Sequence, residues 1–140
     1  MLWSVLAAIL LGFLAGLRTF TPPAVLMLMR RGTPFAYLLG VLALAEYAGD
    51  LYPKTPARTG PVGLIARACS GAFCGWEVSL LISGTPAAIV VAVGAVAAIL
   101  GAYVGLAVRL RAIKLIGRVP SALLEDAFTI ASSVAVVAFV

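Results

Sequence analysis

The acidic side chains of this sequence are few, and all of them lie in apolar segments. Among 140 residues there are five: Glu46, Asp50, Glu77, Glu125 and Asp126. None lies in the one clearly polar loop, residues 53–61. A charge at the centre of a membrane costs about 2.5–3.5 kcal/mol on insertion scales, so it needs a charged partner or water. Carboxylates held at that depth are therefore candidate ligands for an ion or a small charged solute.

Glu46 and Asp50 are four residues apart, and this spacing places them on one face of a helix. They lie near the carboxyl end of that helix, where the helix dipole is already negative, so they need cations nearby. The candidate cations are Lys54 and Arg58 in the following loop, and Arg18 and Arg67 on other elements. Two interpretations stay open: a charge-paired helix end that fixes the loop, or an ion or proton site.

Glu125 and Asp126 lie in the second turn of the last predicted helix. Acids are favoured near a helix amino terminus, and Arg118 is close in sequence, so simple compensation of the dipole is one interpretation. Adjacent residues diverge by roughly 100° around a helix, so we expect the two carboxylates to meet different partners. The other interpretation is a role in the same charged site as Glu46 and Asp50.

The segment from Arg18 to Pro23 reads Arg-Thr-Phe-Thr-Pro-Pro and predicts a broken helix. Paired prolines remove two backbone donors and disfavour a helical conformation in the residue before them. Such breaks occur at membrane depth only where they are buried in protein or line a wet cavity. The hydroxyls of Thr19 and Thr21 and the freed carbonyls would then bind an ion. The alternative is an interfacial cap with Arg18 extended to the headgroups.

Composition identifies the class of protein. Hydrophobic residues make up 64% of the chain and charged residues 11%, and the mean hydropathy is +1.17. A soluble domain of this size could not bury so much apolar surface, so we expect a multi-pass protein of the inner (plasma) membrane. Disordered chains and disulfide scaffolds are excluded, and nucleic-acid binding is disfavoured despite the net charge of +5.

Histidine is absent, which removes the commonest metal ligand and general base. Cys69 and Cys74 match no zinc motif and face different sides of a helix, which indicates two small buried side chains. We therefore predict no metal, no cofactor and no enzymatic activity. An aspartyl dyad of Asp50 and Asp126 is the one catalytic hypothesis considered, and the chain is too small for it.

The hydrophobic pattern predicts a single all-α domain, residues 1–140, built as a transmembrane bundle. Four spans are expected: 1–17, 35–51, 87–108 and 121–140. Residues 24–29 are too short to span, so they are either the start of a return or a half-helix inside the protein. Residues 62–82 either cross, giving five spans, or re-enter through a bend at Gly71, giving four. Both arrangements satisfy the positive-inside rule, so the orientation stays open.

Three glycine pairs at four-residue spacing allow close helix packing, within the chain or between subunits: Gly12–Gly16, Gly71–Gly75 and Gly101–Gly105. Residues 12–17 also resemble residues 101–106, and an internal duplication is one hypothesis for this likeness. A chain this short encloses little alone, so we predict a homodimer. Three basic residues follow the third predicted span: Arg111, Lys114 and Arg118. Their spacings of three, four and seven residues place the side chains on one helix face, where they would contact anionic lipid headgroups.

Two segments, residues 16–24 and 46–58, give the sequence a family resemblance. They contain Arg18 before a double proline, and an acidic and then basic helix end before a proline loop. The chain resembles the bacterial integral membrane proteins grouped as domain of unknown function 4126, over nearly its whole length. The resemblance implies no established activity. It implies only that certain residues match the family pattern: Arg18, Pro22, Pro23, Glu46, Asp50, Lys54, Arg58, Glu125 and Asp126.

The sequence thus predicts a small transporter or channel for an ion or a small charged solute. The alternative is a non-transport membrane module that binds lipid or assembles with other subunits. The residues expected at the solute site are Arg18, Thr19, Thr21, Glu46, Asp50, Lys54, Arg58, Arg67, Glu77, Glu125 and Asp126.

Overall fold

The computed structural model describes residues 1–52 and 59–140, and this part of the chain forms six α-helices. They are α1 (Leu2–Leu17), α2 (Thr21–Arg30), α3 (Pro34–Asp50), α4 (Pro61–Leu81), α5 (Ala87–Ile116) and α6 (Arg118–Ala138). The prediction of an all-α fold is confirmed. Three helices, α4, α5 and α6, are long and apolar enough to cross a membrane, and α1 is a shorter apolar helix. The expected count of four to five spans is not confirmed.

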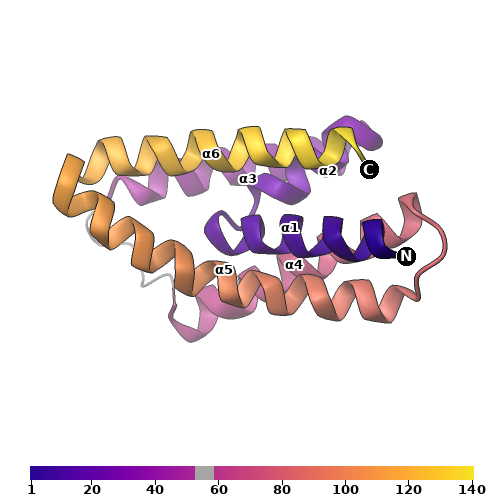
Figure 1. The fold of residues 1–140 in the computed structure, drawn as a ribbon. Helices are drawn as coiled ribbons and strands as arrows, with labels where there is room; N and C mark the ends of the chain where they lie inside the picture. The colour runs from indigo at the N-terminus through magenta and orange to yellow at the C-terminus, as the bar shows by residue number, and fades with distance from the viewer. Residues whose placement is uncertain (53–58) are drawn as a thin grey trace.

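The helices lie in two layers, with α1, α4 and α5 in one and α2, α3 and α6 in the other (Figure 1). One end of the bundle, here called the N-terminal end, holds Met1 and the turns after α2 and α4. There Ser4 Oγ lies 2.6 Å from Thr85 Oγ1, and Arg30 donates to Val137 O at 2.8 Å. The opposite end holds the ends of α3 and α5, where Arg118 donates to Tyr52 O at 2.8 Å.

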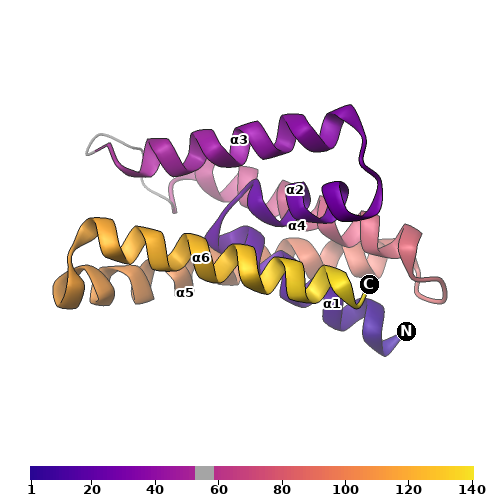
Figure 2. The same ribbon diagram turned by 90° about the horizontal axis from the view of Figure 1, so that it is seen from above.

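The first two helices form a hairpin. α1 runs inward from the N-terminal end, the chain passes from one layer to the other, and α2 runs back to the same end (Figures 1 and 2). The tip of this hairpin is Arg18, Thr19 and Phe20. The prediction that residues 1–17 cross the membrane is therefore not confirmed: α1 has 16 residues, about 24 Å, is shorter than the helices long enough to span, and ends inside the bundle. Residues 24–29 belong to the returning half-helix.

The α4 helix is continuous through Gly71, so the alternative in which residues 62–82 bend there and re-enter is wrong. Gly71 serves close packing instead. A methyl group at Gly71 would overlap the carbonyl oxygen of Gly94 on α5, and one at Gly12 of α1 would overlap the same oxygen. Glycine allows three backbones to meet at this point.

The predicted glycine pairs pack α1, α4 and α5 against one another within one chain. Gly16 lies against Ala98 and Gly101, and Gly101 lies against Phe13. The similar segments 12–17 and 101–106 are thus in contact, which gives their shared glycine spacing a packing reason that needs no duplication. All of these contacts lie within one chain, and the homodimer, which the short length of the chain predicts, stays a prediction.

Replacing Gly94 by alanine should destabilise the bundle by about 1–3 kcal/mol, because the new methyl group would overlap the carbonyl oxygen of Gly71 and must push α4 away from α5. Gly49→Ala is the matched control, since no atom beyond its own surroundings on α3 lies within 4 Å of the added carbon. We expect that variant to change stability by less than about 1 kcal/mol. Thermal melting in detergent, followed by circular dichroism, makes the comparison. Equal melting temperatures for the two variants would contradict the close contact.

The chain reverses between α5 and α6 at Gly117, whose φ of 89° favours glycine. The prediction that Arg111, Lys114 and Arg118 share one helix face is therefore wrong, because Arg118 opens α6 while the other two end α5. All three side chains are exposed at the opposite end of the bundle.

Candidate functional site

The hairpin tip is held by a carboxylate from α3. Glu46 accepts hydrogen bonds from the backbone N–H groups of Thr19, at 2.9 Å, and Phe20, at 3.1 Å. These groups stand just before the first residue of α2, where the helix dipole is positive, so the carboxylate caps this helix. Prolines at positions two and three of α2 begin the helix without needing donors of their own.

The other freed backbone groups of the tip are bound by α4. Arg67 Nε donates to Gly16 O at 3.0 Å, and Ser70 Oγ donates to Thr19 O. Arg67 also lies 3.9 Å from Glu46, so the two side chains that hold the tip are themselves paired. Thr21 and Tyr47 share a 2.5 Å hydrogen bond between their hydroxyls. The break that the sequence predicts is thus satisfied by side chains from two neighbouring helices.

Arg18 is the charged group at the tip and is almost fully buried, with 1% of its side chain exposed. One guanidinium nitrogen lies 2.6 Å from Asp50 of α3, and the other pairs with Asp126 of α6. The guanidinium carbon also lies 5.4 Å from the centre of the Tyr47 ring, in cation–π contact. Arg18 therefore joins α1, α3 and α6 from inside the bundle.

A second arginine extends this cluster. Arg109 of α5 pairs with Asp50 and, at 3.1 Å, with Glu125 of α6. Asp50 thus bridges two arginines, and each arginine holds two carboxylates. We call Arg18, Asp50, Arg109, Glu125 and Asp126 the arginine–carboxylate network. Seven residues separate Arg109 from the end of α5, which places the network about 10 Å inside the opposite end.

The structure brings together most of the residues that the sequence singled out. Glu125 and Asp126 take different arginines, as their divergence around the helix predicts. The tip and the network include Arg18, Thr19, Thr21, Glu46, Asp50, Arg67, Glu125 and Asp126. The structure does not bring Glu77 to them: Glu77 pairs with Arg31 at 2.8 Å, near the N-terminal end. Lys54 and Arg58 lie outside the described residues.

Arg109 is the network residue that sequence reasoning missed, because it directly follows the predicted span 87–108, where basic residues commonly face the headgroups. The spacing of residues along α5 does indicate that Arg109 faces inward. Gly101, Gly105 and Arg109 are spaced four apart, and both glycines are buried. Arg109 therefore continues the face of α5 that packs inward, whereas Arg111 is turned away from it.

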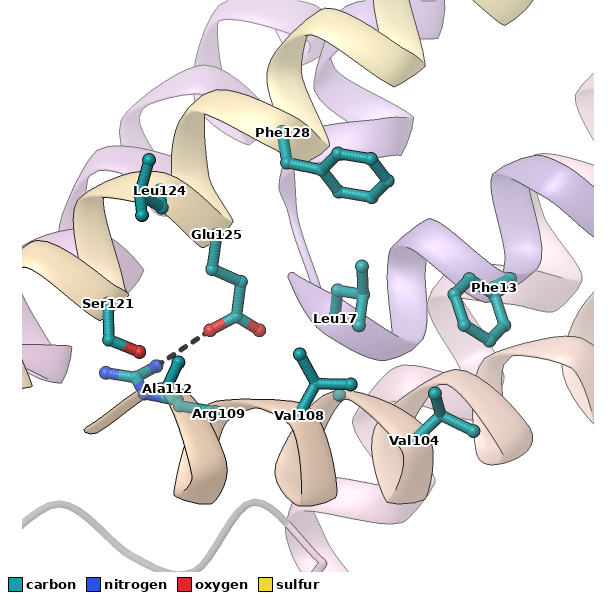
Figure 3. A pocket seen from close by; sticks show the side chains of 11 residues that line it. Phe13, Leu17, Val104, Val108, Arg109, Ala112, Ser121, Leu124, Glu125 and Phe128 are labelled. Carbon is teal, nitrogen blue, oxygen red and sulfur yellow. Dashed lines mark hydrogen bonds and ion pairs between the residues drawn. The ribbon is translucent and has the colours of Figure 1, made fainter. Parts of the chain in front are cut away.

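A cavity of about 450 Å³ reaches the network from the side, between α1, α5 and α6. We call it the α1–α5–α6 groove. Its walls are mainly apolar, and Glu125 extends across one end of it toward Arg109 (Figure 3). The other lining side chains labelled there are Phe13, Leu17, Val104, Val108, Ala112, Ser121, Leu124 and Phe128. A second cavity of about 320 Å³ lies between α2, α3 and α4 and reaches Thr19 and Phe20. One cavity thus adjoins the network and the other adjoins the tip.

The candidate site thus consists of paired arginines and carboxylates that lie beside two cavities. No protein-family model, curated protein or solved structure matches this chain. The resemblance to domain of unknown function 4126 accordingly stays a prediction, and the function has to be argued from the site itself.

Proposed function

We propose that this protein is a small membrane transporter for an ion or a small charged solute, with the arginine–carboxylate network as its site. The observation that carries the proposal is the buried pairing of Arg18 with acids from α3 and α6 at the tip of the α1–α2 hairpin. Charged groups are costly in a bilayer, and apolar packing would hold helices together more cheaply. Their presence in the interior favours a role in handling charge.

The proposal includes an arrangement in the membrane. We place α3 across it together with α4, α5 and α6, with the hairpin entering from the N-terminal end. Arg111, Lys114 and Arg118 then stand at the opposite end, which the positive-inside rule makes cytoplasmic. The network lies about 10 Å from that end, within reach of a solute entering from the cytoplasm.

The shared ion pairs give the site a way to exchange partners. Asp50 is held by two arginines, and Arg109 is held by two carboxylates, so a solute charge can replace one contact while the other is kept. The Arg109–Glu125 contact borders the groove, so we assign it as the first to open.

A non-transport membrane module is the second candidate, and the pairing of each network charge favours it. In this case the network is a permanent clamp that fixes the hairpin, and no solute displaces its contacts. The two functions differ in what a conservative change at Glu125 does: a clamp loses stability, whereas a transporter also loses flux.

Flux into proteoliposomes tests the proposal, with a panel of monovalent and divalent cations, halides, protons and small organic ions. We expect uptake of one class by the wild-type protein and a loss of at least tenfold in Asp50→Asn and Glu125→Gln. Glu77→Gln is the matched control, because its carboxylate lies outside the network, and it should retain the flux.

Each variant is checked for its melting temperature in detergent, so that loss of flux is separated from loss of fold. A wild-type protein that moves nothing in the panel, or a Glu77→Gln variant that loses flux as fully as Glu125→Gln does, would overturn the proposal.

A further inference from the structure

The α1–α5–α6 groove has a composition that does not suit an inorganic ion. Apart from its charged end, it is lined by large apolar side chains, among them Phe13, Leu17, Val108 and Phe128. Its volume of about 450 Å³ falls in the usual range for small-molecule pockets, roughly 300–1,000 Å³. A ligand that fills it must be mostly hydrocarbon.

The groove also has the length and position of a lipid chain. Its wall on α5 runs from Val104 to Ala112 and its wall on α6 from Ser121 to Phe128, about 10–12 Å in each case. One leaflet of a bilayer has about 15 Å of hydrocarbon. Val108 and Phe128 are each 58% exposed, so the groove opens sideways toward the surrounding lipid.

The polar end of the groove is marked by exposed cations. Arg111 lies between the lining residues Arg109 and Ala112 on α5, at the edge of the groove, and Arg118 precedes Ser121 by three residues on α6, one turn beyond the lining. The side chains of Glu125 and Asp50 are only 11% and 21% exposed and are held by arginines. A ligand headgroup at this end therefore meets positive charge.

We propose that the α1–α5–α6 groove binds one anionic phospholipid, with an acyl chain along the groove and the phosphate at Arg111 and Arg118. The lipid site adjoins the proposed transport site at Glu125, but binding of the lipid requires no solute and no movement of the network. The bound chain covers the apolar walls beside Glu125 and keeps bulk water away from the Arg109–Glu125 pair, which strengthens that pair.

Native mass spectrometry of the detergent-purified protein tests the proposal, with dioleoyl phosphatidylglycerol as the anionic probe and dioleoyl phosphatidylcholine as the neutral-headgroup comparison. We expect one retained phosphatidylglycerol per chain. Val108→Trp, which fills the groove, should lower retention at least tenfold. Val96→Trp is the matched control: it is on the same helix, is 57% exposed, does not line the groove and should bind as the wild type does.

A second pair of variants keeps the test decisive if Val108→Trp folds poorly. Leu124→Trp blocks the opposite wall, and the double variant Arg111→Gln with Arg118→Gln should remove the preference for phosphatidylglycerol over phosphatidylcholine. Equal lipid retention by the Val96→Trp variant and the groove-filling variants would overturn the proposal. So would a second copy of the chain seated in the groove, seen as a lipid-free dimer that Val108→Trp dissociates.

Discussion

Replacing Arg18 by methionine should destabilise the protein by about 3–5 kcal/mol, the usual cost of removing one partner from a buried ion pair. The variant leaves Asp126 without its arginine and deprives Asp50 of one of two. The methionine also gives up the cation–π contact with Tyr47. Reversible unfolding in mixed micelles measures the loss, and Arg111→Met, which removes an exposed arginine, should change stability by only about 0.5 kcal/mol.

A second substitution distinguishes the buried charge from simple loss of packing. Combining Arg18→Met with Asp126→Leu removes both partners of one ion pair and puts apolar volume in their place, which is often neutral or stabilising. The double variant should therefore recover at least half of the stability that the single variant loses. A loss below 1 kcal/mol for Arg18→Met, or no recovery in the double variant, would contradict the buried pairing.

The sequence predicts the site better than it predicts the path of the chain. The rule that carboxylates in apolar segments need partners singles out Asp50, Glu125 and Asp126, and the double proline marks the break beside Arg18. These inferences depend on local chemistry that any membrane fold must satisfy. They required no knowledge of which helices are neighbours.

The hairpin formed by α1 and α2 could not be predicted from hydrophobicity, because an apolar segment of about 17 residues is compatible with either crossing a membrane or stopping short. The outcome depends on whether other helices can form hydrogen bonds with the backbone N–H and C=O groups that are left free where the helix breaks. Glu46 and Arg67 do this from 26 or more residues away in sequence. Nothing in residues 1–17 encodes that support.

Hydrophobicity also does not predict what glycine does in α4. A glycine inside an apolar segment is equally compatible with a bend or with close packing, and Gly71 packs against Gly94 of α5. Gly117 was not identified as a break because the basic residues around it continue a helical spacing. The positive φ that it adopts separates Arg118 from Arg111 and Lys114.

We propose that α1 and α2 enter and leave the membrane by the same face, which carries Arg18 into the interior. Labelling with a membrane-impermeant maleimide tests it on a background in which Cys69 and Cys74 are replaced by alanine. Single cysteines replace Leu2, Ser83 and Leu115, all exposed residues near helix ends. Labelling is compared in intact and in inverted membrane vesicles.

The hairpin predicts that Leu2→Cys and Ser83→Cys react from one side and Leu115→Cys from the other, with at least a tenfold difference between the two kinds of vesicle. If α1 crossed the membrane, Leu2→Cys would instead react together with Leu115→Cys and opposite to Ser83→Cys. That result would contradict the re-entrant hairpin and, with it, the placement of Arg18 at its tip.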